Sequence, residues 1–113
     1  MTDRPERWCA DAGAADIATL DIPASAGRRR VFEIDVRLVV AVPAGGAAAW
    51  HELAVELDGR QQWRRRLDAH GPTDSLDYHC RREVPVGQAL RVRALSRVGG
   101  CLRQRLLIEA EEG

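Results

Sequence analysis

The twelve residues Val31-Phe32-Glu33-Ile34-Asp35-Val36-Arg37-Leu38-Val39-Val40-Ala41-Val42 carry the strongest structural pattern in this chain of 113 residues. Apolar side chains occupy every even position from 32 to 42, and charged residues stand between them at 33, 35 and 37. Because successive side chains of a strand point to opposite faces, this alternation predicts a β-strand with one buried face.

Further apolar or alternating runs lie on both sides of this stretch, separated by Gly, Pro or Asp-Gly, at residues 17–22, 51–57, 60–67, 76–84, 89–97 and 101–109. No run has the period of an amphipathic helix, and turn signals recur about every ten residues. The pattern predicts an all-β, two-sheet antiparallel β-sandwich of about seven strands. Residues 1–16 contain few aliphatic side chains and are expected to form a loosely ordered arm, with 17–110 as a single domain.

Two hairpins are expected. The first joins 51–57 to 60–67 through Asp58-Gly59, a strong turn signal. A two-residue turn would pair Leu53 with Arg64 and mix apolar with charged side chains on one face. A three-residue turn separates the two kinds, so we expect the longer turn.

The second expected hairpin joins 89–97 to 101–109 through Val98-Gly99-Gly100. A three-residue turn would pair Val92 with Leu106 on the apolar face and place both strands in one sheet.

The charge of the chain is unevenly distributed. All seventeen basic residues are arginine, and the chain has no lysine or asparagine, a bias that GC-rich coding sequences produce without any functional cause. Residues 1–59 hold six arginines against ten acidic residues, a net of −4, and residues 60–113 hold eleven against seven, a net of +4. The positions of the arginines, and not their number, therefore indicate where a charged surface could lie.

If both hairpins belong to one sheet, its outer face carries an arginine-rich surface made of Arg60, Arg64, Arg66, Arg91, Arg93, Arg97, Arg103 and Arg105. Arg93 would then lie opposite Arg105, a like-charge pair that destabilises a sheet unless the field is used to attract a partner. The residues expected to bind the partner are Arg91, Arg93, Arg97, Arg103, Arg105, Arg64, Arg66 and Trp50. The alternative interpretation is that such arginines only keep edge strands soluble.

Catalytic and metal-binding patterns are weak in this chain. The three histidines and three cysteines lack the short spacings of zinc ligands, and His79 and Cys80 point to opposite faces of a strand. Asp74-Ser75 stands in no nucleophile motif and is expected to make turn hydrogen bonds. We expect no enzyme activity, no catalytic residue, no metal site and no cofactor.

Two segments resemble known families. Pro85 to Gly100 (P-V-G-Q-A-L-R-V-R-A-L-S-R-V-G-G) resembles the end of a fibronectin type III domain, and the resemblance extends through the following strand to Glu109. The family's usual Tyr is replaced by Leu90, and its core Trp by Phe32. Residues 74–80 (D-S-L-D-Y-H-C) resemble a segment of immunoglobulin variable domains, without its partner cysteine. The resemblance implies a sandwich fold and no particular activity.

The sequence therefore predicts a non-enzymatic interaction module that binds an acidic protein or another anionic ligand. Nucleic acid is less favoured because aromatic residues do not interleave with the arginines, and an open edge strand would permit a homodimer. The alternative function is a small-ligand or carbohydrate-binding module that uses exposed Trp50 and Trp63; burial of Trp63 would count against it.

The odd number of cysteines, the charged start and the absence of a long apolar run favour a cytoplasmic protein without membrane contact.

Overall fold

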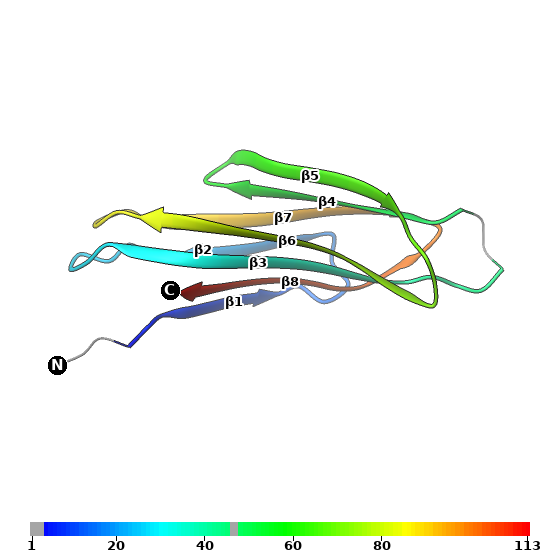
Figure 1. Cartoon of the computed structure of the whole chain (residues 1–113), viewed down its shortest axis with the longest axis horizontal. Helices are drawn as coiled ribbons and strands as arrows, with labels where there is room; N and C mark the ends of the chain where they lie inside the picture. The colour runs from blue at the N-terminus through cyan, green and yellow to red at the C-terminus, as the bar shows by residue number, and fades with distance from the viewer. Residues whose placement is uncertain (1–3, 46–47) are drawn as a thin grey trace.

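The computed structural model describes residues 4–45 and 48–113, and this part of the chain contains eight β-strands and no helix (Figure 1). The strands are β1 (Arg7–Asp11), β2 (Ile17–Ile22), β3 (Arg30–Ala41), β4 (Trp50–Leu57), β5 (Arg60–Asp68), β6 (Thr73–Val84), β7 (Leu90–Gly99) and β8 (Leu102–Glu112). They form two antiparallel sheets, sheet A in the order β1-β8-β3-β6 and sheet B in the order β2-β7-β4-β5. The predicted all-β sandwich is confirmed, with eight strands in place of about seven.

The two sheets stack into a flat, elongated molecule of 57 × 27 × 18 Å, with the start of β1 and the end of β8 toward the same end (Figure 1). The predicted strand at 31–42 is confirmed as β3, a central strand of sheet A. Its even-numbered side chains, Phe32 through Val40, are at most 1% exposed and form the middle of the core. Facing residues of sheet B, among them Leu53 and Val92, are fully buried and complete that core.

The strands pair from the ends of the chain inward: the first pairs with the last, the second with the second last, and so on. The chain pairs β1 with β8, β2 with β7, β3 with β6, and β4 with β5, as a long hairpin does when it is wound into two layers. This order is the jelly-roll arrangement of eight strands. It differs from the immunoglobulin arrangement, in which the last two strands are neighbours in one sheet. The resemblance to fibronectin and immunoglobulin domains therefore extends to the sandwich architecture and not to this strand order.

The expected hairpin between 89–97 and 101–109 does not form. β7 lies in sheet B between β2 and β4, whereas β8 lies in sheet A between β1 and β3. The connection through Gly100, which has φ = 67°, carries the chain from one sheet to the other. A glycine turn reverses the chain in either case, so it does not encode whether two strands remain in one sheet.

The Asp58-Gly59 hairpin forms, but by a different turn. Leu57 pairs with Arg60, so the turn has two residues, and both Asp58 (φ 50°) and Gly59 (φ 81°) have the positive φ of a type I′ turn. A β-bulge directly after it shifts the register. With this register Val55 pairs with Trp63 on the core side, but Leu53 pairs with Arg65, so the expected separation of apolar and charged faces is only partly realised.

Residues 7–11 were expected in a loose arm, and the structure places them in β1, paired with β8 along its whole length. Few aliphatic side chains are needed there because main-chain pairing and one aromatic contact hold the strand. Trp8 packs partly buried against the core, and its indole N–H donates to Glu6 at 2.9 Å. No helix of the described residues is long and apolar enough to cross a membrane.

Candidate functional site

The structure divides the predicted arginine-rich surface between the two sheets. Five of its arginines and Trp50 share the outer face of sheet B, namely Arg64 and Arg66 on β5 and Arg91, Arg93 and Arg97 on β7. Arg103 and Arg105 belong to β8 and therefore to sheet A. Arg93 does not oppose Arg105, as was expected, but lies between Thr19 and Glu56.

Neighbouring strands neutralise part of the remaining face. Arg91 bonds Asp21 of β2 at 2.7 Å, and Arg93 lies 3.5 Å from Glu56 of β4. The contribution of β2 was not foreseen, because the predicted sheet contained β8 in its place. These two arginines are thus engaged in ion pairs within the sheet.

The other three arginines gather around a single carboxylate. Glu52 of β4 has neighbours on both sides in the sheet, Arg66 on β5 and Arg97 on β7. Its Oε1 accepts hydrogen bonds from Arg64 at 3.0 Å and from Arg66 at 3.2 Å. We call Glu52, Arg64, Arg66 and Arg97 the Glu52 cluster.

Burial and charge act in opposite directions on Glu52. The residue is 6% exposed, and burial disfavours its ionised form, but hydrogen bonds and charge from Arg64 and Arg66 outweigh this effect. The pKa of the Glu52 carboxyl therefore lies below its ordinary value, and the group is ionised at neutral pH. The cluster holds three positive charges against one negative charge.

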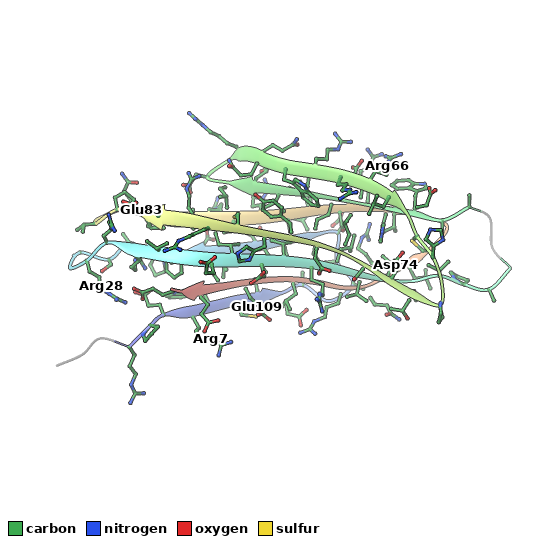
Figure 2. All side chains as sticks on the ribbon, in the orientation of Figure 1. Arg7, Arg28, Arg66, Asp74, Glu83 and Glu109 are labelled. Atoms are coloured by element: carbon green, nitrogen blue, oxygen red, sulfur yellow. The ribbon has the colours of Figure 1, made fainter. Side chains whose placement is uncertain are left out.

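Trp50 completes the cluster on its outer side. The guanidinium carbon of Arg66 lies 3.9 Å from the centre of the Trp50 ring, a close cation–π contact. The indole in turn lies directly over Gly99, where a Cβ atom would overlap it. Figure 2 shows Arg66 at the upper edge of the molecule, on β5. Trp50 and Gly99 thus hold one arginine of the cluster in position.

Arg97 differs from Arg64 and Arg66 in making no ion pair within the described part of the chain. It is exposed, and among residues 4–45 and 48–113 no carboxylate oxygen lies within 4.0 Å of its guanidinium, although Glu52 is its neighbour across the sheet. Because Glu52 is already hydrogen-bonded to Arg64 and Arg66, the positive charge of Arg97 is available to an external anion.

The tryptophans offer little open ring surface. The Trp63 ring stacks on Tyr78 of β6 with centroids 4.9 Å apart and 25° between planes, and the residue is partly buried. Trp50 is covered by Arg66. These contacts occupy ring faces that a carbohydrate would need, which speaks against the alternative function.

The outer face of sheet A carries an acidic cluster that sequence reasoning missed. Glu33 lies directly opposite Glu111, and Asp35 directly opposite Glu109, so like charges face each other on the two central strands (Glu109 is labelled in Figure 2). His79 of β6 lies between two of these carboxylates, with Nδ1 2.8 Å from Asp35 and Nε2 2.9 Å from Glu33. The period-two pattern contains these positions, but finding the cluster required knowing that β3 and β8 are neighbours.

The acidic neighbours change the titration of His79. The hydrogen bond and charge of Asp35, with a smaller contribution from Glu33, raise the pKa of the His79 imidazole above its ordinary value of 6.5 and outweigh the opposing effect of burial. In the protonated form both ring nitrogens are donors, which matches the two carboxylate contacts.

The predicted turn role of Asp74 is confirmed. Its carboxylate accepts hydrogen bonds from the main-chain N–H of His70 at 2.9 Å and of Ser75 at 2.8 Å. Cys101 is buried, and its thiol donates to the Trp50 carbonyl at 3.4 Å. These residues stabilise loops at one end of the sandwich.

Comparison with known proteins yields matches at the level of fold alone. No protein-family model and no curated protein matches the chain. Among solved structures, dimeric latent PorU from Porphyromonas gingivalis aligns with 96% of this chain and 12% of its own at a TM-score of 0.61 and 13% identity. The T13 viral particle of IBDV aligns with 96% of this chain and 31% of its own, at a TM-score of 0.48 and 13% identity. The chain spans a small part of these proteins, and at 13% identity the likeness to PorU shows a shared fold and nothing more.

Proposed function

We propose that the chain is a non-enzymatic interaction module that binds an acidic partner through the Glu52 cluster. The observation that carries this proposal is that Arg64 and Arg66 both bond the buried carboxylate of Glu52, while Arg97, its neighbour across the sheet, has no ion-pair partner within the described part of the chain. The excess positive charge is not cancelled within the sheet, so a carboxylate of a partner gains an ion pair there without breaking one.

Order in the cluster supports the same proposal. Two of its three guanidinium groups are held by Glu52, and one of them also by Trp50, before any partner arrives. A held guanidinium loses less conformational freedom on binding than a free one. Arginines that only kept the protein soluble would not need to be held in place by Glu52 and Trp50.

We also propose that the module works in a reducing compartment such as the cytoplasm. The support is that Cys9, Cys80 and Cys101 are all free thiols in the structure. Disulfide formation is rare in that compartment.

The first prediction concerns Arg97, which is exposed and whose substitution should leave the fold intact. Arg97→Glu should weaken binding of a fluorescent oligoglutamate of about ten residues by roughly five- to tenfold at low salt, because exposed ion pairs contribute about 0.2–1 kcal/mol and reversal adds repulsion. Fluorescence anisotropy at several salt concentrations measures this, and affinity of the native chain should fall as salt rises.

Arg4→Glu is the matched control, since Arg4 is exposed and lies before β1, away from sheet B. It changes the net charge equally and should alter the affinity far less. Equal losses in the two variants, or native binding that salt does not weaken, would contradict the proposed site.

A further inference from the structure

β5 is an open edge of sheet B. It pairs with β4 on one side, and apart from that ladder its residues take part in no main-chain hydrogen bond within the described part of the chain. An edge strand presents a row of unpaired N–H and C=O groups, which is a template for one more strand. Figure 1 shows β5 along the outer margin of the molecule, with no element beyond it.

The shape of β5 suits an added strand. Eight of its nine residues are exposed, and the strand contains neither proline nor glycine. Its bulge lies at the turn end, so Trp63 to Asp68 pair regularly with β4. Six residues of strand extend about 20 Å at roughly 3.3 Å per residue, enough for a short extended segment.

The other three edge strands, β1, β2 and β6, are less suited to pairing with an added strand. β1 and β2 have five and six residues, and the connection between them is tied to the sandwich by the bonds from Ala12 N to Leu106 O and from Ser96 N to Asp16 O. β6 has twelve residues, but its outer face carries both acidic and basic side chains, and these form ion pairs, Arg37 with Asp77 and Arg29 with Glu83 among them. β5 alone combines an open edge with an excess of positive charge, four arginines against one aspartate.

The net positive charge of β5 favours an acidic segment as the strand that pairs with its open edge. The strand carries Arg60, Arg64, Arg65 and Arg66 against Asp68, and among the described residues no carboxylate oxygen lies within 4.0 Å of Arg60 or Arg65. A second copy paired through the same edge would bring arginines against arginines, which destabilises a sheet. An acidic segment places carboxylates at those positions instead.

We propose that β5 accepts an extended acidic segment of a partner protein as a fifth strand of sheet B. Carboxylates on one side of the added strand lie beside Arg64 and Arg66, and those on the other side lie beside Arg65, because successive side chains of a strand alternate. This inference rests on the proposed function and extends it, since main-chain pairing along β5 adds to the ion pairs of the Glu52 cluster.

Arg65 distinguishes strand addition from simple docking on the sheet face. It points to the opposite side of β5 from Arg64 and Arg66, as its place between them requires. A partner that lies flat on the outer face meets Arg64 and Arg66 only, whereas an added strand meets all three. Arg65→Glu should therefore weaken oligoglutamate binding by roughly five- to tenfold, and far more than Arg4→Glu.

The direct test compares two oligoglutamates of about ten residues, one with an ordinary backbone and one N-methylated at two adjacent central residues, so that both of its hydrogen-bonding edges are blocked. The native chain should bind the N-methylated peptide at least about tenfold more weakly. With the ordinary peptide bound, the outward-facing main-chain amides of residues 63–68 should exchange with solvent about tenfold more slowly.

The outcomes separate the two proposals. If both peptides bind equally, the exchange of residues 63–68 does not change and Arg97→Glu still weakens binding, strand addition is overturned and docking on the Glu52 cluster stands. If neither peptide binds at low salt, both proposals are overturned. Weaker binding of the methylated peptide together with slower exchange in β5 supports both.

Discussion

Gly99 illustrates at the scale of one residue how a backbone position supports a surface cluster. The Trp50 indole occupies the space where a Cβ of residue 99 would lie, and the same ring carries Arg66. A glycine is therefore required here by close approach of a side chain and not by an unusual backbone angle.

Gly99→Ala should displace Trp50 and lower the free energy of unfolding by about 1–3 kcal/mol, as overpacking does in a tightly packed site. Urea denaturation followed by fluorescence measures the change. Gly27→Ala is the control, because nothing lies within 4 Å of a Cβ there and its φ is not positive; it should change the stability by less than about 0.5 kcal/mol. Equal stability of the Gly99 variant and the native chain would show that the Trp50 position is not fixed by this contact.

At the scale of the elements, β3, β6 and β8 together create the acidic cluster on sheet A. Two carboxylate pairs face each other across β3 and β8, and His79 of β6 offsets part of that repulsion when it is protonated. The like-charge pairing expected for Arg93 and Arg105 is thus absent, and like-charge pairing exists instead between acidic residues.

His79 should make the stability of the native chain depend on pH. Its pKa is raised in the folded chain, so the stabilisation is fully present below the ordinary value of 6.5 and is lost as the pH rises through the folded value. His79→Gln should accordingly destabilise the protein at pH below 6.5 and approach the native stability at higher pH.

Urea denaturation at a series of pH values, on both the variant and the native chain, measures this difference. His70→Gln is the control, because His70 is exposed in a loop and its ring makes no hydrogen bond in the described structure. A destabilisation by His79→Gln that stays constant across the series would mean that His79 acts by packing and not by charge.

At the scale of the whole molecule, a network around the buried Arg30 and the half-buried Arg28 connects the start of β1 with the end of β8. Arg30 is 2% exposed, and its guanidinium donates to Glu6 and to the carbonyl of Pro23, each at 2.8 Å. Arg28 bonds both Glu6 and Glu112, which connects the start of β1 to the end of β8. This network closes the end of the sandwich at which β1 starts and β8 ends.

Arg30→Met should lower the free energy of unfolding by about 2–4 kcal/mol, because it removes one of the two guanidinium partners of the partly buried Glu6 and the donor to the Pro23 carbonyl. Arg29→Met is the control, since Arg29 is exposed and makes only a surface ion pair with Glu83, and its loss should cost under about 1 kcal/mol. Thermal denaturation of both variants checks the ranking, and similar losses would exclude a special role for the buried network.

The sequence by itself determined seven of the eight strands, all except β1, together with the core-facing side chains of the central strand and the places where the chain turns. The alternation in 31–42 becomes β3 with each even-numbered side chain from Phe32 to Val40 buried, and Asp58-Gly59 becomes a hairpin turn. These properties are local, since side-chain direction and turn geometry depend on neighbours in the chain.

Only the tertiary structure decided which strands are neighbours. The glycine connection after β7 sends β8 to sheet A, which removes Arg103 and Arg105 from the predicted surface and brings Asp21 of β2 against Arg91. The three-arginine cluster around Glu52 depends likewise on β5 and β7 both flanking β4. Alternation is the same for a strand in either sheet, so sheet membership follows from the packing of the whole chain and not from the pattern of any one segment.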